Sequence, residues 1–234
     1  MDLGLNGKRA VVAAATAGLG YATARHLADA GARVVICGRD KERLDTAVNF
    51  LGANALGIQA DLSTPAGATE FMESAIGQLG GVDILITNSG GPKPGDDAST
   101  PTASYPAALD ANLVAMIELC KCALPSMKDQ RWGRIVGITS VAVRQPIPTL
   151  ILSNTARAGF TAYLKTLARE VASLGITVNT VQPGLHATDR LKQLYGESDP
   201  AVNIPAGTVG DPDDFGAIVA FLCSQHAKFI TGTH

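Results

Sequence analysis

The sequence has little charge of either sign and almost no imbalance between the two signs. Its 234 residues include 19 lysines and arginines and 21 aspartates and glutamates, which gives a formal net charge of −2. Proteins that bind nucleic acid or anionic membranes need clustered positive charge, so neither partner is expected. Charged residues make up 17% of the chain and hydrophobic residues 46%. This composition predicts a packed core and excludes a disordered chain.

Long apolar runs are missing as well. The uninterrupted apolar stretches are of strand length, so none is expected to span a membrane. The first residues, 1–5, have neither a basic start nor an apolar segment, so no secretory signal is expected there. Four cysteines, Cys37, Cys120, Cys122 and Cys223, lack the paired spacing of a metal site and are expected to be free thiols. A cytoplasmic protein without a metal centre is predicted.

Apolar runs and segments of helical periodicity alternate along the chain. The predicted strands are 9–15, 33–37, 57–60, 82–87, 134–139 and 176–181. The predicted helices are 19–30, 41–51, 65–79, 103–128, 155–173 and 212–223, with Pro106 and Pro125 expected to trim the ends of the fourth. Strands that are apolar throughout are typical of a parallel sheet covered on both faces. The sequence therefore predicts one α/β domain over 1–234, a single doubly wound parallel sheet of the Rossmann type with helices on both faces.

A glycine turn follows the first predicted strand. Gly18, Leu19 and Gly20 lie between that strand and the first helix. The free N–H groups and positive dipole end of a helix bind phosphate, and glycine allows a close approach. A turn in this place fits the dinucleotide-binding pattern, so a cofactor pyrophosphate is predicted here. The alternative interpretation is a tight turn that binds nothing.

Small or polar residues also follow three other predicted strands. Asp61 and Leu62 follow the third strand, Asn88-Ser89-Gly90 the fourth, and Pro183-Gly184 the sixth. In an open α/β sheet, ligands bind outside the carboxyl ends of the strands. These segments are therefore expected to form one site, bordered by loop-like stretches at 90–102 and 188–210.

Motifs at these positions resemble those of the short-chain dehydrogenase/reductase family over nearly the full length, in particular its 3-oxoacyl-ACP-reductase-like members. The family's TGxxxGxG is represented by residues 13–20, in which Ala13-Ala14 replace the first Thr-Gly. Its NNAG is represented by residues 87–90, its helix asparagine by Asn112 and its catalytic serine by Ser140. The resemblance implies a NAD(P)(H)-dependent oxidoreductase of a carbonyl or alcohol. The expected cofactor-binding residues are Thr16, Gly18, Leu19, Gly20, Arg39, Asp61, Leu62, Asn88, Ser89, Gly90, Arg157, Pro183, Gly184 and Thr188.

The end of the second predicted strand favours the phosphorylated nicotinamide cofactor. An acidic residue there would bind the ribose diol of NAD(H), whereas a basic residue favours the extra phosphate of NADP(H). This chain has Gly38 at the acidic position and Arg39 after it. Because arginine binds phosphate through two parallel donors, NADP(H) is favoured and NAD(H) is the alternative. The other interpretation of Arg39 is a solvated surface charge.

The catalytic tyrosine and lysine of the family are replaced. Where Tyr-x-x-x-Lys is expected, the chain has Ser153 and Arg157, four residues apart and on one helix face. A serine hydroxyl is far less acidic than a tyrosine, and arginine does not relay a proton. A divergent branch of the family is similar in this pattern and in the segment 90–95, GGPKPG. Ser140 is expected to polarise the carbonyl, and Ser153 to contact the substrate or a water that donates the proton. Arg157 is expected to bind the ribose and to stabilise negative charge, and Asn112 to bind a water or the backbone.

Two hypotheses of different kinds follow from the missing tyrosine. In the first, the chain is an oxidoreductase with altered proton delivery, and 3-oxoacyl thioesters, ketones and sugar-like alcohols are its candidate small-molecule substrates. In the second, it is a non-catalytic nucleotide-binding sensor or a structural subunit of an oligomer. The alternative proton donors are Tyr105, Tyr163, His186 and Lys93, although a lone histidine or lysine on a loop is more often solvated.

The resemblance also implies a lid and an oligomer. A substrate lid is expected around 186–207, and a dimer face on the helices around Asn112 and Arg157, so a homodimer or homotetramer is expected. Phe160, Leu164 and Leu167 are candidates for either core or interface. Relatives continue into a seventh strand beyond residues 231–234, so either a shortened C-terminus or an incomplete sequence is expected.

Overall fold

A parallel sheet runs through the middle of the molecule, and the computed structural model describes residues 1–196 and 199–234. Its strands lie in the order β3-β2-β1-β4-β5-β6. The strands are β1 (Arg9–Val12), β2 (Arg33–Gly38), β3 (Ala55–Gln59), β4 (Ile84–Thr87), β5 (Gly133–Ile138) and β6 (Ile176–Val181). The α-helices are α1 (Gly18–Asp29), α2 (Lys41–Leu51), α3 (Pro65–Leu79), α4 (Tyr105–Leu109), α5 (Ala115–Asp129), α6 (Ile151–Val171), α7 (Asp189–Tyr195) and α8 (Pro212–Cys223).

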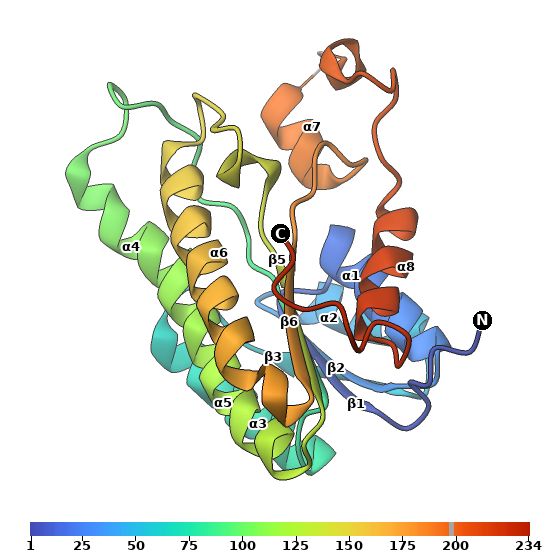
Figure 1. Cartoon of the computed structure of the whole chain (residues 1–234). Helices are drawn as coiled ribbons and strands as arrows, with labels where there is room; N and C mark the ends of the chain where they lie inside the picture. The colour runs from blue at the N-terminus through green and yellow to red at the C-terminus, as the bar shows by residue number, and fades with distance from the viewer. Residues whose placement is uncertain (197–198) are drawn as a thin grey trace.

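One layer of helices covers each face of the sheet (Figure 1). The core on one face is filled by α3, α5 and α6, and the core on the other face by α1, α2 and α8. Successive residues of β1 serve the two cores in turn, with Val11 in the first and Val12 in the second. This explains why the strands are apolar without alternation. Phe160, Leu164 and Leu167, which could serve either core or interface, are all buried in the first core.

The winding of the sheet changes direction beside its first strand. β1 pairs with β2 on one side and with β4 on the other, all in parallel. Crossovers on the two sides therefore place helices on opposite faces and open a crevice at the carboxyl ends of β1 and β4. The predicted doubly wound α/β sheet is confirmed.

Two predicted boundaries shift near the crevice. β1 ends at Val12, earlier than the predicted 9–15, because the backbone turns at Ala14 with a φ of +47°. Two hydrogen bonds still hold the following residues to the sheet, from Ala13 N to Ile86 O and from Ala15 N to Cys37 O. α6 begins four residues before the predicted 155–173, so Ser153 lies in its first turn.

The helix predicted at 103–128 is a composite of several segments. A 3-10 turn (Thr102–Ser104) leads into α4, and a π-helical turn, η2 (Asp110–Val114), separates α4 from α5. Pro106 lies in the first turn of α4, as expected. The prediction that Pro125 ends the helix is wrong, because Pro125 lies inside α5. The carbonyl that loses its N–H partner there belongs to Lys121, which is exposed, so water can satisfy it.

The stretch 188–210, expected as a loop, contains α7. The Thr188 hydroxyl caps this helix by accepting from Leu191 N at 3.4 Å, and Gly196 ends it with a φ of +58°. A parallel bridge between His186 and Gly210 closes the base of the segment. Residues 197 and 198 of the predicted lid lie outside the described residues. Within the described ranges, no helix is long and apolar enough to cross a bilayer.

The last residues lie along the outer edge of β6. Thr180 N donates to Thr233 O, and Gly232 N donates to Val178 O. The Asn179 amide donates to Ile230 O and accepts from Thr233 N and Oγ1. The tail thus covers the outer edge of β6.

Candidate functional site

The glycine turn leaves the first amides of α1 uncapped. α2, α3 and α8 begin with side-chain caps, provided by Asp40, Thr64 and Asp211. α1 follows Ala17, and in the described part of the chain no side chain caps its first turn. Gly18 has a φ of +60°, which glycine adopts without strain. An anion is therefore the missing cap that this turn fits, as a cofactor pyrophosphate requires.

Asn88 ties the end of β4 to this turn. Its side-chain Nδ2 donates to Ala14 O at 3.0 Å. A Cβ built on Gly20 would lie 2.7 Å from the same Nδ2 and 3.0 Å from Ala14 O, so this position has no room for a side chain. Ala14 stands where the family motif has its first glycine, and its positive φ costs roughly 1 kcal/mol that glycine would avoid. The turn thus forms despite the replaced Thr-Gly pair.

The end of β2 offers positive charge beside the turn. Thr16 packs against Gly38, where a built Cβ would lie 2.3 Å from Thr16 Cγ2. Arg39 follows and is exposed, with its carbonyl accepting from Gln59 Nε2 at 2.8 Å. Thr16 also lines a depression of about 420 Å³ together with Arg43 and Glu42. Two arginines and one glutamate therefore border the place predicted for the extra phosphate.

The segment after β3 presents one polar and one apolar side chain. Asp61 is exposed, and its Oδ1 accepts from Ser63 N at 3.0 Å. Leu62 is buried in the core under α3. Asp61 is thus exposed at the carboxyl edge, where cofactor binding is predicted.

Arg157 is the centre of a hydrogen-bonded cluster at the carboxyl ends of β4 and β5. Its Nε donates to Ser153 Oγ at 3.3 Å, and its Nη1 donates to Ile138 O at 3.0 Å and Thr139 O at 3.3 Å. Its Nη2 donates to Ser89 O at 3.2 Å and to Asn112 Oδ1 at 3.4 Å. These bonds use all five N–H groups of the guanidinium. Burial lowers the pKa of Arg157 to about 10, with a smaller contribution from the positive charge of Arg190.

Asn112 lies buried in the π-helical turn η2. Its Oδ1 also accepts from Ser89 Oγ at 2.9 Å, and its Nδ2 donates to Ala108 O at 3.3 Å. Such single π turns are frequent at functional sites. The structure brings Asn112, Ser153, Arg157 and Ser89 into one cluster, although they come from three different segments.

Ser140 stands just beyond the end of β5 and follows Thr139, whose carbonyl accepts from Arg157 of this cluster. Its Oγ accepts from Ala142 N at 3.1 Å, which leaves its hydroxyl hydrogen to donate elsewhere. The next residue links the strand to the end of β6, because Val141 N donates to Pro183 O at 3.1 Å. A Cβ built on Gly184 would meet nothing within 4 Å, so Pro183-Gly184 borders open space.

The start of α7 lies close to the phosphate turn. A Cβ built on Gly18 would lie 3.5 Å from Thr188 Cγ2. Arg190, two residues on, lies across Gly91 and donates from Nη2 to Pro92 O at 3.0 Å. Sequence analysis missed Arg190. Its position directly after the helix-capping pair Thr188-Asp189 was the available signal, since a helix there turns the side chain toward the crevice.

The alternative proton donors lie in other surroundings. Tyr163 is half-buried against Phe160, with ring centroids 6.1 Å apart, and burial raises the pKa of its hydroxyl. The His186 ring packs edge-on against Phe215 at 5.3 Å. Lys93 is exposed. Their packing and exposure give none of these three side chains a defined place beside Ser140.

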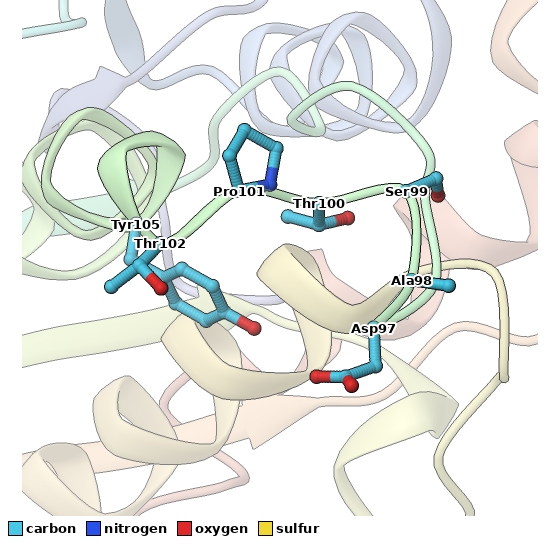
Figure 2. A pocket seen from close by; sticks show the side chains of 7 residues that line it. All are labelled: Asp97, Ala98, Ser99, Thr100, Pro101, Thr102 and Tyr105. Atoms are coloured by element: carbon cyan, nitrogen blue, oxygen red, sulfur yellow. The ribbon is translucent and has the colours of Figure 1, made fainter.

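Tyr105 belongs to a separate pocket of about 650 Å³ on the loop before α4 (Figure 2). Asp97 of that loop and Tyr105 at the start of α4 extend to the same side. The remaining lining residues are Ala98, Ser99, Thr100, Pro101 and Thr102. Apart from Tyr105, this pocket contains none of the predicted site residues, so it is distinct from the crevice.

The sheet order, the uncapped turn and the polar cluster define an oxidoreductase of the nicotinamide-dependent α/β class. The family model for short chain dehydrogenases matches residues 8–198. A 3-oxoacyl-[acyl-carrier-protein] reductase from Vibrio cholerae is 34% identical over 232 residues, which covers 98% of this chain and 95% of the relative. The chain therefore belongs to the short-chain dehydrogenase family.

Solved structures share the whole fold. L-sorbose reductase from Gluconobacter frateurii, complexed with NADPH and L-sorbose, has a TM-score of 0.92 and 27% identity, covering 100% of this chain and 95% of that chain. YwfH, an NADPH-dependent reductase involved in bacilysin biosynthesis, has the same TM-score and identity over 97% of this chain and 95% of its own. The predicted family and the predicted class of nicotinamide-dependent oxidoreductase are confirmed.

Proposed function

We propose that this protein is an NADP(H)-dependent reductase of a small carbonyl compound, which also oxidises the corresponding alcohol. The observation that carries the proposal is the Ser89–Asn112–Arg157–Ser153 cluster, which adjoins Ser140 at the sheet edge where α1 begins uncapped. The similar L-sorbose reductase and YwfH are both NADPH enzymes, which supports the phosphorylated cofactor. Residues 1–234 act as one dinucleotide-binding domain, with 186–207 as its lid.

The cofactor is held along the carboxyl edge of the sheet. The amides of Gly18, Leu19 and Gly20 bind the pyrophosphate, and Thr16 and Arg39 bind the extra phosphate. The remaining cofactor contacts come from the strand ends and the lid, through Asp61, Leu62, Asn88, Ser89, Gly90, Pro183, Gly184 and Thr188. The bound cofactor supplies the hydride.

Ser140 and Ser153 act on the substrate carbonyl. The Ser140 hydroxyl donates to the carbonyl oxygen and polarises it. The Ser153 oxygen accepts from Arg157 Nε, so its own hydrogen remains to donate to the substrate or to a water that delivers the proton. Asn112 and Arg157 position the neighbouring residues and do not contact the substrate, because their polar atoms are already bonded within the protein. The positive charge of Arg157 stabilises the oxyanion through the field, without direct contact.

The second candidate function is a nucleotide-binding sensor or structural subunit. The hydrogen bonds of Arg157 favour this second function. All N–H groups of its guanidinium are bonded within the protein, so none remains to bind the ribose as the family lysine would. The two candidates differ in turnover and share cofactor binding. With NADPH bound, loss of nicotinamide absorbance on a panel of ketones, 3-oxoacyl thioesters and keto-sugars supports the reductase. NADPH binding without turnover on any of them supports the sensor.

Cofactor choice is tested by Arg39→Gln. The variant is expected to bind NADPH about ten- to a hundredfold more weakly in calorimetry, with NADH affinity unchanged, because one charge-assisted phosphate contact is lost. Arg33→Gln is the matched control, since Arg33 is exposed at the opposite end of the same strand. Equal losses for NADPH and NADH would contradict the assignment of Arg39.

We also propose a homodimer or homotetramer in the cytoplasm. Ile218 and Phe221 are exposed on α8, and Phe229 beyond it is 98% exposed. Exposed apolar side chains that gather on one element are typical of protein–protein contacts, so α8 is proposed as a contact face in addition to the helices around Asn112 and Arg157. The four cysteines are free thiols, three of them buried, which suits a reducing compartment.

A further inference from the structure

Two guanidinium groups reach the segment after β4 from different elements. Arg157 comes from α6 and donates to Ser89 O at 3.2 Å. Arg190 comes from α7, lies across Gly91 and donates to Pro92 O at 3.0 Å. Gly90 lies between these attachment points, and a Cβ built on it would meet nothing within 4 Å. The two cations therefore flank a piece of backbone that borders open space.

The described residues neutralise neither cation. Within residues 1–196 and 199–234, no carboxylate lies within ion-pair distance of Arg157 or Arg190. Burial lowers the pKa of both guanidinium groups, and Arg190 lowers that of Arg157 further. Two like charges in a partly desolvated crevice repel each other, and an anion placed near both relieves the repulsion.

The two arginines differ in the donors that they have left. Arg157 donates all five N–H groups to protein oxygens, so it contributes charge only. Arg190 donates one hydrogen bond, from Nη2, to the described part of the chain. The second Nη2 hydrogen remains, and together with the N–H of either Nε or Nη1 it forms a planar fork, which matches the two oxygens of a carboxylate.

We propose that the substrate is an oxo acid, a carbonyl compound whose carboxylate is bound by Arg190 of the lid while its carbonyl oxygen accepts from Ser140. This inference rests on the proposed reductase function and names its substrate class. The positive field of Arg157 favours the same anion. A neutral ester or ketone lacks the group that the free donors of Arg190 fit.

The test compares acids with their neutral esters on the NADPH-loaded protein. Acetoacetate and levulinate are assayed against their methyl esters by loss of nicotinamide absorbance. Wild-type protein is expected to favour each acid in kcat/KM. Arg190→Gln is expected to reduce that preference about ten- to a hundredfold, with kcat/KM for the acid falling far more than kcat/KM for the ester, because a charge-assisted contact is lost. Lys192→Gln is the matched control, since Lys192 lies on the same helix with its side chain 82% exposed, and it is expected to keep the preference.

Binding measurements separate the possible failures. If no ketone turns over, the reductase function itself fails, and calorimetry of acetoacetate into the NADP⁺ complex then tests only the anion-binding role of Arg190, which binding that Arg190→Gln abolishes would support. Equal use or equal binding of acid and ester by the wild type overturns it. A loss of NADPH affinity in Arg190→Gln as large as the loss of acid preference also overturns it, because Arg190 then binds a cofactor phosphate. Failure of the wild type to bind NADPH at all would rule out the proposed function itself.

Discussion

The arginine that replaces the family lysine works as a connector between strand ends. Lysine has a single ammonium group, whereas the guanidinium of Arg157 places donors in fixed directions. These donors bond to the end of β4, to the end of β5 and to η2 at the same time. Ser153 becomes part of the connector, since it accepts from Nε. Where the family has a lysine that relays a proton, this chain therefore has an arginine that links the strand ends rigidly.

Arg157→Met is expected to lower the free energy of unfolding by roughly 3 kcal/mol, because buried carbonyls lose their donors. For a chain of this size, that corresponds to a melting temperature lower by about 6–12 °C in differential scanning calorimetry. Arg169→Met is the control, as Arg169 is exposed on the same helix, and a change within about 0.5 kcal/mol is expected. Equal effects of the two variants would show that Arg157 does not link the strand ends.

At the scale of elements, an ion pair fixes the amino ends of β1 and β4, opposite the site. Arg9 Nη2 lies 2.7 Å from Asp83 Oδ1, and Arg9 N and Nε also donate to this carboxylate. Burial raises the pKa of Asp83, but the hydrogen bonds from Arg9 outweigh burial, so that the pKa is lowered overall. The carboxylate therefore stabilises the fold when it is ionised.

Asp83→Asn is expected to lower the free energy of unfolding by about 1–3 kcal/mol at neutral pH. Because the folded-state pKa of Asp83 lies below its unfolded value, this contribution is complete above about pH 4. It is lost as the pH falls through the folded value. Denaturant unfolding from pH 7 to pH 3 should therefore show the gap between wild type and variant narrowing only at the acid end. Asp45→Asn, in the exposed pair with Lys41, should show almost no gap at any pH.

Elements with a clear apolar period could be predicted from the sequence, and the local irregularities could not. The ranges 41–51, 65–79, 176–181 and 212–223 match α2, α3, β6 and α8 to the residue. The π turn around Asn112 has no sequence signal, because it depends on the bonds of this side chain to Ser89 and Arg157. The early start of α6 depends on tertiary contact, since Ile151 N donates to Gly95 O of a distant loop.

The candidate site likewise contains residues that could be predicted from the sequence and contacts that could not. Gly18, Gly20, Ser140 and Asn112 stand in family motifs, so their places at the sheet edge could be expected. The bonds of Arg157 could not be predicted, because its acceptors are mostly backbone carbonyls, which every residue carries. Arg190 was not predicted as a site residue, because it lies on α7, a helix in a stretch where the sequence predicts a loop.

At the scale of the whole molecule, the exposed apolar side chains of α8 and of the segment after it are separate from the crevice. α8 and the segment after it carry Ile218 and Phe229, while the site lies at the carboxyl edge of the sheet. Self-association through α8 would therefore leave the crevice accessible.

Light scattering coupled to size exclusion is expected to give a dimer or tetramer for the wild type. Ile218→Asp is expected to shift it toward monomer, because a charge would be buried without a partner. Phe50→Asp removes an apolar side chain that is 77% exposed on α2 and should leave the assembly intact. A wild type that stays monomeric at high micromolar concentration would exclude the proposed oligomer.

The link between Ser153 and Arg157 also constrains how this sequence can change over time. Arg157→Lys alone removes most of the donors that join β4 to β5, and Ser153→Tyr alone removes the acceptor of Nε. Each single step away from the present pair therefore passes through a less stable intermediate, although the family's tyrosine and lysine fit each other. The two positions are epistatic, and a lineage that has acquired one pair is expected to keep it.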